Sequence, residues 1–411
     1  MAYKIAGIDI HKQVLMVVIM DAEAMGAAPL RRRFNSVASD LRRMADWLVE
    51  QGVKEAVMES TAQYWKPVWY ELEDCMRCHL AQAFSNRARR GRKHDFRDAI
   101  RLVRRLVADE LVLSFVPGQE QREWRSMTRT RVQLARDRVR VHNQVEALLE
   151  EMRIKLSSVV SDWLGSSGQR ILRALAAGET DAQRLAELGD ERLECSPERL
   201  RDALTGRATA MQQKVLQLHM ERLQFIEEQI AELNRMIAQA LKPHEDAVTR
   251  LAEMTGFGVD SAQPFIAEVG PEAATFPTAR DLTSWSGTNP GQDTSAEKNH
   301  SGRSAKGNKY VRRLLTEVTQ AAVKAKGSHF QAVFRRLVPR LGYRQALWAV
   351  VNRINRVAWK ILHDKVRFVE QSPDRDAKAQ KRRAQTLARE LRKLGYRVEL
   401  AKPLNPAPAL G

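Results

Sequence analysis

The segment that decides the fold is Tyr3-Lys-Ile-Ala-Gly-Ile-Asp9-Ile-His11, a short apolar run that carries one acid near its end. Its composition predicts a buried β-strand. A carboxylate on such a strand needs a partner, because an isolated buried charge is costly. Two interpretations of this segment remain open: Asp9 binds a cation, or it caps an ordinary turn into His11 and Lys12.

The residues that follow predict a sheet with helices. Apolar runs predict strands at 13–20, 30–34, 53–60 and 79–84, and helical periodicity predicts helices at 37–51, at 61–74 and from 95 onward. Three strands, helix, strand, helix, strand, helix is the element order of the ribonuclease H fold. A doubly wound α/β domain is the alternative.

Four acids occupy matching places on these elements. Asp9 and Glu59 lie at the C-terminal ends of predicted strands, where an open α/β sheet places its active site. Asp95 and Asp98 are three residues apart at the start of a helix, so they share one face. Two Mg²⁺ ions about 4 Å apart suit phosphodiester chemistry, and Mg²⁺ prefers carboxylate oxygens. The four acids therefore predict a magnesium site, with charge balance in an arginine-rich helix as the alternative role of the second pair.

The charge of the chain favours a nucleic-acid partner. Lys and Arg number 68 against 50 Asp and Glu, a formal charge of +18, and each neutralised phosphate releases counterions and strengthens binding. Residues 87–105 hold nine basic side chains, and residues 298–363 hold fifteen with one acid, Glu317. A merely soluble surface mixes its signs, so both blocks are predicted binding surfaces. The candidate nucleic-acid-binding residues are Arg87, Arg89, Arg90, Arg92 and Lys93 in the first block and Lys298, Arg303, Lys306, Lys309, Arg312 and Arg313 in the second.

Two long helices are predicted in the middle of the chain. Residues 124–152 and 216–240 carry apolar residues at alternating steps of three and four; Arg131 and Arg138 interrupt the first series, and His219 lies in the second. A pattern sustained over several heptads predicts a coiled coil, within the chain or between protomers. We therefore expect a homo-oligomer, a dimer or a tetramer.

The C-terminal half contains two glycine-rich turns and a tail. Gly256-Phe-Gly258 either points backbone N–H groups at a phosphate or forms a plain interhelical turn. Residues 285–309 form a basic loop with Ser295, Ser301 and Ser304. A serine between cations can attack a phosphodiester, and phosphate binding alone is the alternative. The tail from residue 372 onward is basic, and we expect it to order on nucleic acid.

Composition also bears on the compartment. Three cysteines cannot make a disulfide framework, and Cys75-Met-Arg-Cys78 lacks the second ligand pair of a zinc finger. No apolar run approaches the roughly 18 to 20 residues that a membrane span needs, and the first residues lead straight into a strand rather than a cleavable signal. We expect a cytoplasmic protein with no membrane partner.

An ordered set of motifs resembles one family. The motifs are Gly7-Ile-Asp9-Ile-His-Lys12, Met58-Glu-Ser-Thr-Ala-Gln-Tyr-Trp65, Lys93-His-Asp95-Phe-Arg-Asp98-Ala99, Gly256-Phe-Gly258, Trp285-Ser-Gly-Thr-Asn-Pro290 and Lys306-Gly-Asn-Lys-Tyr-Val-Arg-Arg-Leu-Leu315. Together they resemble the DEDD-type transposases of bacterial insertion sequences, which are bridge-RNA-guided serine recombinases. The resemblance runs from residue 4 to residue 365 in the order of the family.

The resemblance implies a domain plan of the α/β plus α class. A RuvC-like domain of ribonuclease H fold at 1–115 would hold Mg²⁺ with Asp9, Glu59, Asp95 and Asp98, followed by a coiled-coil region at 116–245. A mainly helical C-terminal transposase domain at 246–370 would carry the nucleophilic serine, and a basic tail would follow at 371–411.

The serine of the family falls on Ser295 when counted from Pro290. The family commonly has glycine after this serine, whereas Ala296 follows here, so Ser301, which precedes Gly302, is the second candidate. The family's Lys-Thr-Asp reads Lys-His-Asp at residues 93–95, which leaves the acid intact.

The function implied is recombination of double-stranded donor and target DNA, guided by a structured noncoding RNA that pairs with both. The serine would hold a DNA strand covalently, with the acidic tetrad assisting in a composite site built across protomers. Two alternatives remain open: a RuvC-like endonuclease that uses metal-activated water without a covalent intermediate, and a nucleic-acid-binding scaffold with inert acids.

Overall fold

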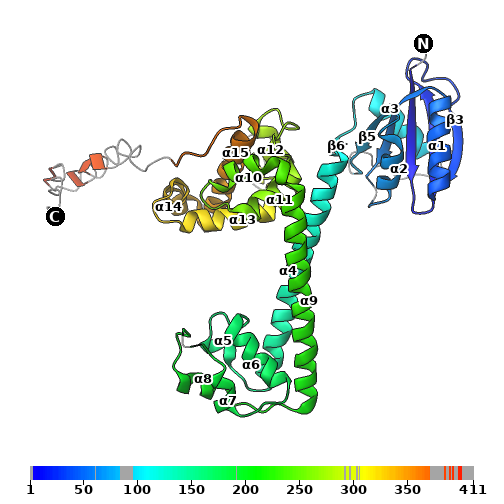
Figure 1. Ribbon diagram of the computed structural model, residues 1–411. Helices are drawn as coiled ribbons and strands as arrows, with labels where there is room; N and C mark the ends of the chain where they lie inside the picture. The colour runs from blue at the N-terminus through cyan, green and yellow to red at the C-terminus, as the bar shows by residue number, and fades with distance from the viewer. Residues whose placement is uncertain are drawn as a thin grey trace. The chain divides into compact units, whose positions relative to one another are not determined.

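The computed structural model describes residues 3–60, 62–83, 96–190, 192–290, 293–295, 298–301, 304 and 306–370, with short pieces between 384 and 399. The chain divides into two compact units, residues 1–118 and residues 119–411 (Figure 1). The first unit is a mixed sheet with helices, and the second is mostly helical. The expected α/β plus α class is confirmed at this level.

The first unit is built on a sheet of six strands in the order β3-β2-β1-β4-β5-β6. The strands are β1 (Lys4–Ile10), β2 (Val14–Asp21), β3 (Leu30–Asn35), β4 (Val53–Glu59), β5 (Arg77–Ala81) and β6 (Leu113–Ser114). β1 pairs antiparallel with β2, and β2 with β3, whereas β1, β4 and β5 are parallel to one another. The antiparallel strands exclude a doubly wound parallel sheet. The short sixth strand, antiparallel to β5, was not predicted.

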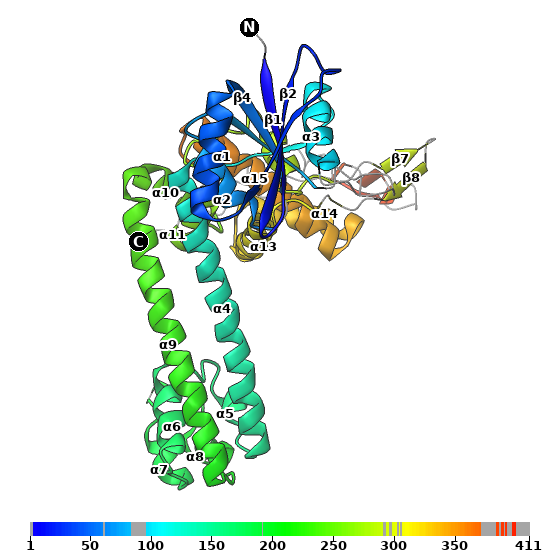
Figure 2. The ribbon, with the colours of Figure 1, turned by 90° about the vertical axis from the view of Figure 1, so that its right-hand side faces the viewer.

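Helices cover both faces of this sheet because side chains alternate along each strand. Ala6, Ile8 and Ile10 share a core with α1 (Ala38–Glu50) and α2 (Trp65–Leu72), whereas Ile5 and Val57 share a second core with α3 (Arg97–Val107). Figure 2 shows α1 and α2 on one side of the strands and α3 on the other. A strand buried on both faces explains why residues 5–8, up to the acid, are apolar without interruption.

The helix α3 lies directly on β1 at Gly7. A Cβ added there would be 2.2 Å from the carbonyl oxygen of Ala99 and 2.7 Å from Cγ2 of Val103. Only glycine allows the backbone of α3 to approach this closely. The first turn of α3 is therefore fixed against the strand that carries Asp9.

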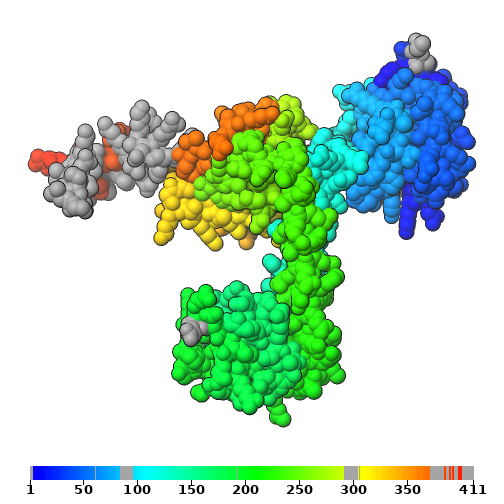
Figure 3. Space-filling model, in the orientation of Figure 1, coloured from blue at the N-terminus to red at the C-terminus, as the bar shows by residue number. Residues whose placement is uncertain are grey.

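The second unit contains two long helices, α4 (Gln119–Glu151) and α9 (Ala210–Ala240), that run antiparallel and pack along each other. Trp124 near the start of α4 shares a core with Ile237 near the end of α9, and Val141 shares another with Leu216. The pair forms a narrow stem within this unit (Figure 3). The predicted apolar series thus packs within the chain.

Each end of the stem carries a helical group. At one end lie α5 (Leu156–Val159), α6 (Ser166–Ala176), α7 (Ala182–Glu187) and α8 (Pro197–Leu204). At the other lie a 3₁₀ turn (Lys242–His244), α10 (Glu245–Ala252), α11 (Val259–Val269), α12 (Ala279–Trp285), the strands β7 (Asp293–Ser295) and β8 (Lys298–Ser301), α13 (Lys309–Lys324), α14 (His329–Leu341) and α15 (Tyr343–His363). None of the helices in the described parts of the chain has the length and apolarity that crossing a membrane requires.

Candidate functional site

Asp9 and Glu59 end two neighbouring parallel strands. The register pairs Ile8 of β1 with Met58 of β4, so the next residue of each strand is an acid. The alternation of side chains places Asp9 and Glu59 on the face that α3 covers, the same face as Ile5 and Val57. The two acids therefore meet at one edge of the sheet, as the sequence predicted.

Asp98 reaches this edge from the first turn of α3. An acid at a helix N-terminus is favoured by the helix dipole, and the contact between α3 and Gly7 fixes the distance of that turn from β1. Asp98 Oδ1 also lies 2.9 Å from a guanidinium nitrogen of Arg101. We refer to Asp9, Glu59 and Asp98 as the acidic edge. The fourth predicted ligand, Asp95, lies outside the described residues.

The electrostatics of the acidic edge fit a cation. Burial raises the pKa of Asp9, and the charges of Asp98 and Glu59 raise it further, whereas His11, whose Nε2 lies 3.2 Å from Asp9 Oδ2, lowers it. A cation among these carboxylates would offset both the desolvation and the mutual repulsion. Within the described ranges, however, no three acidic, histidine or cysteine side chains already stand close enough together to hold a metal.

The serine loop, residues 290–305, contains a β-hairpin. β7 pairs antiparallel with β8, and the register places Ser295 opposite Lys298 and Asp293 opposite Ser301. Ser295 is thus the last strand residue before the tip of the hairpin, and Ser301 lies at its base. The side chains of residues 291–303, and the whole basic block Arg87–Lys93, lie outside the described part of the chain.

Two asparagines of α15 hold residues 286–289, which lead into the serine loop and are called the entry segment below. Asn355 of α15 is fully buried and donates to Ser286 Oγ at 2.8 Å and to Thr288 Oγ1 at 3.0 Å. One turn earlier, Asn352 donates to the Thr288 carbonyl at 3.3 Å and to Asn289 Oδ1 at 2.9 Å. The entry segment is therefore fixed to α15.

Residues 306–308, which leave the serine loop and are called the exit segment, pack on the entry segment. Gly307 has a φ of +41°, and a Cβ there would lie 2.2 Å from the backbone of Ser286. Arg312 donates to the Gly287 carbonyl and, at 3.2 Å, to Ser304 Oγ, while its guanidinium lies 4.6 Å from the centre of the Trp348 ring. Both ends of the serine loop are thus joined.

The remaining basic candidates of this region point outward. Lys306, Lys309 and Arg313 are exposed, and Arg313 forms an ion pair with Glu317 at 2.8 Å. Arg312 differs from these residues, because its hydrogen bonds to Gly287 and Ser304 connect the two ends of the serine loop.

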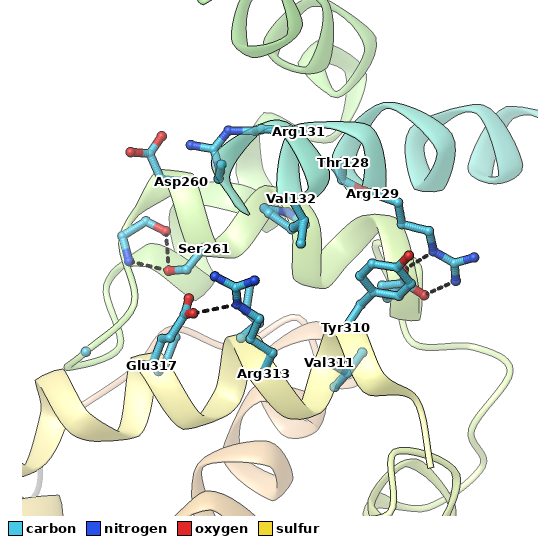
Figure 4. A pocket seen from close by; sticks show the side chains of 17 residues that line it. Thr128, Arg129, Arg131, Val132, Asp260, Ser261, Tyr310, Val311, Arg313 and Glu317 are labelled. Carbon is cyan, nitrogen blue, oxygen red and sulfur yellow. Dashed lines mark hydrogen bonds and ion pairs between the residues drawn. The ribbon is translucent and has the colours of Figure 1, made fainter. Parts of the chain in front are cut away.

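Glu268 is a buried carboxylate behind the exit segment that the sequence did not single out. It is 3% exposed and accepts two hydrogen bonds from Arg129 of α4, at 2.7 and 2.9 Å, and one from Asn308 Nδ2 at 2.8 Å. Arg125 lies 3.5 Å from the same carboxylate, and burial lowers the pKa of Arg125 to about 10. A cavity of about 410 Å³ lies beside these groups, between α4, α11 and α13 (Figure 4).

Comparison with known proteins gives two family matches and a relative. A model for DEDD proteins of IS110 elements, described as Transposase, matches residues 6–154, and a model described as Transposase IS116/IS110/IS902 family matches residues 248–335. A Pseudomonas aeruginosa protein named "Probable family 20 transposase" is 26% identical over 364 residues, which cover 87% of this chain and 96% of that protein. The first match spans the four predicted metal ligands, and the second spans both candidate serines.

Proposed function

From the premise that the chain belongs to the IS110-type transposases, we propose that it cuts and rejoins DNA through a serine nucleophile assisted by a magnesium-binding acidic site. Ser295 is the first candidate nucleophile and Ser301 the second. The domain plan is the one expected from the sequence, with a RuvC-like ribonuclease H fold at 1–115 and a transposase domain at 246–370. The strand order of the first unit supports that fold assignment.

The proposed metal ligands are Asp9, Glu59, Asp98 and Asp95. The raised pKa of Asp9, which burial and the neighbouring acids cause, is the property that a bound cation would reverse. When bound, Mg²⁺ would stabilise the charge that develops on a phosphodiester during cleavage. The acids would hold the ion, and the contact of α3 with Gly7 keeps Asp98 near Asp9.

The proposed nucleophile acts by transesterification. The serine hydroxyl oxygen attacks phosphorus, its proton leaves to a base, and a DNA hydroxyl is released while the strand stays attached to the protein. A second DNA hydroxyl then reverses the step and rejoins the strand. The covalent ester conserves bond energy, which suits strand exchange better than hydrolysis.

One observation carries the serine proposal: side-chain hydrogen bonds, those of Asn355 fully buried, hold both ends of the serine loop. A nucleophile needs a rigid support, and Asn355 on the entry segment and Arg312 across the two ends provide it. Such a frame exceeds what a loop that only touches phosphates requires.

The proposed partners are double-stranded donor and target DNA and a structured noncoding guide RNA, bound by the exposed basic residues of the two blocks. A homo-oligomer is also proposed, with a composite site across protomers. Leu218 and Phe225, seven residues apart on α9, are 54% and 58% exposed, which supports an apolar contact between copies.

A trapping experiment tests the proposal. The protein is incubated with end-labelled DNA of the element's termini, the element's noncoding RNA and Mg²⁺, and denatured complexes are resolved on a gel. A covalent adduct that is lost in Ser295→Ala, and lost without divalent cation or in Asp9→Ala, supports it. The control Asp46→Ala removes an exposed acid from α1, on the opposite face of the sheet, and should react normally. An adduct that survives in both Ser295→Ala and Ser301→Ala refutes the serine mechanism.

The second candidate function is a RuvC-like endonuclease. The position of the acidic edge at the ends of two parallel strands favours it, because metal-activated water could act there without a serine. In that case DNA is cut normally by both serine variants, no adduct forms, and an Asp9→Ala, Glu59→Ala double variant loses cleavage.

A further inference from the structure

The contact between Glu268 and Asn308 joins three helices behind the serine loop. Glu268 lies near the end of α11, its Arg129 and Arg125 partners come from α4, and Asn308 is the residue directly before α13. Three polar side chains, two from α4 and one from the N-cap of α13, therefore meet at one buried carboxylate of α11. A buried carboxylate is stable only with its partners in place, so the geometry of the group is strongly determined.

Asn308 has two separate tasks. Its side-chain oxygen caps α13 by accepting from the N–H groups of Tyr310 and Val311, at 2.9 and 3.2 Å, while its side-chain NH₂ donates to Glu268 Oε2 at 2.8 Å. The first task needs only an acceptor, whereas the second needs a donor. The two tasks can therefore be separated by substitution.

Asn308 also adjoins the exit segment of the serine loop. Gly307 precedes it and packs on Ser286 so closely that a Cβ would not fit. A displacement of Asn308 would be passed to the joined ends of the loop, because the adjoining Gly307 has no room to shift against the backbone of Ser286. Catalytic rates are sensitive to this: a displacement of 1 Å can lower them about 100-fold.

We propose that Glu268 is a positioning residue that, through its hydrogen bond to Asn308, sets the position of the serine loop for strand cleavage. This inference rests on the proposed function. Arg129 and Arg125 hold the carboxylate in the orientation that receives the amide (Figure 4 shows Arg129 beside Tyr310). The hydrogen bonds of Glu268 to Arg129 and Asn308 thus connect α4, the first helix of the second unit, to the base of the serine loop.

A reciprocal substitution tests the link. Asn308→Asp keeps the cap, because aspartate is a good N-cap residue, but it replaces the donor by a second carboxylate against Glu268. We expect adduct formation about 100-fold slower than in the parent protein, with DNA affinity unchanged. Combining it with Glu268→Gln restores a donor–acceptor pair with its direction reversed, and the remaining side-chain oxygen still accepts from Arg129 Nε. The second Arg129 hydrogen bond, to Oε2, is lost. We therefore expect a partial rescue, with the double variant about tenfold faster than Asn308→Asp alone. Ser196→Asp, which places aspartate at the exposed N-cap of α8, is the control and should change neither rate nor affinity.

Two outcomes overturn the inference. In the first, Asn308→Asp reacts like the parent, so capping is the only role of Asn308. In the second, the rate of the double variant equals the value expected from multiplying the rate effects of Asn308→Asp and Glu268→Gln, so the two residues do not act together.

Hydrogen exchange of the peptide that contains Asn308 gives a readout without catalysis. Exchange should be faster in Asn308→Asp than in the parent and return toward the parent rate in the double variant. Exchange that stays fast in the double variant also refutes the coupling of Glu268 and Asn308. If the parent cuts DNA but forms no adduct, the serine proposal fails, while rescue of cleavage and exchange in the double variant still supports the positioning role.

Discussion

An alanine at position 7 tests how the fold positions the acidic edge. The added Cβ would lie 2.2 Å from the Ala99 carbonyl oxygen, a backbone atom that cannot rotate away. Ordinary carbon–oxygen contacts are roughly 3.3 Å or longer, so α3 must move by about 1 Å. Overpacking of this kind costs about 1–3 kcal/mol of stability. The same displacement moves Asp98 away from Asp9, and we expect DNA cleavage to fall about 100-fold.

The assay compares Gly7→Ala with Gly26→Ala, because no atom lies within 4 Å of a Cβ added at Gly26. Hydrogen exchange of residues 97–107 reports the contact of α3 with the sheet, and a cleavage assay with the element's DNA reports the site. We expect faster exchange and slower cleavage in Gly7→Ala alone. Equal exchange and equal cleavage in the two variants would refute the claim that glycine fixes α3.

Three other variants test the acid, the loop frame and the long helix. Burial raises the pKa of Asp9, so the folded state binds more protons than the unfolded state, and stability falls as the pH rises through the folded pKa. In protein free of divalent cations, Asp9→Asn should therefore exceed the parent in melting temperature by more at neutral than at acidic pH, and a gap that does not change with pH contradicts this. Asn355→Ala removes the hydrogen bonds to Ser286 and Thr288 and should lower the free energy of unfolding in urea by about 1–3 kcal/mol and slow strand cleavage. Cleavage at the parent rate would show that the frame is dispensable. Leu218→Ser combined with Phe225→Ser should lower the mass measured by light scattering without loss of helix, and an unchanged mass removes this face of α9 from the oligomer.

The acidic edge was largely predictable because its determinants are local. An apolar run ending in an acid is visible in a short stretch of sequence, and two such runs, ending at Asp9 and Glu59, predict neighbouring strand ends. The close approach at Gly7 was not predictable, since Ala99 and Val103 lie far along the chain from it.

The frame of the serine loop was not predicted because its contacts are distant in sequence. Glu268 and Asn308 are 40 residues apart, and Arg129 is 139 residues from Glu268. A local indication did exist: Glu268 is an acid inside the apolar stretch Phe265–Val269, and an acid in such a place needs buried partners. Which partners it finds depends on the tertiary fold.

The long helices show a smaller difference. The apolar series placed His219 in the seam, whereas the structure buries Met220 and leaves His219 partly exposed. The other buried residues of α9, Leu216, Leu223, Ile226 and Ile237, are all positions of the predicted series, so the difference is confined to one turn of the helix.

The proposed covalent bond between Ser295 and DNA can be tested by identifying the residue that carries the DNA. Trypsin cleaves after Lys and Arg, so Ser295 lies in the peptide of residues 281–298 and Ser301 in the peptide of residues 299–303. The trapped adduct is digested with nuclease and trypsin, and the nucleotide that remains is located by mass spectrometry. We expect a nucleotide phosphate on Ser295 in the longer peptide. DNA cut in the same reaction with no nucleotide on any serine of residues 281–303 would contradict it.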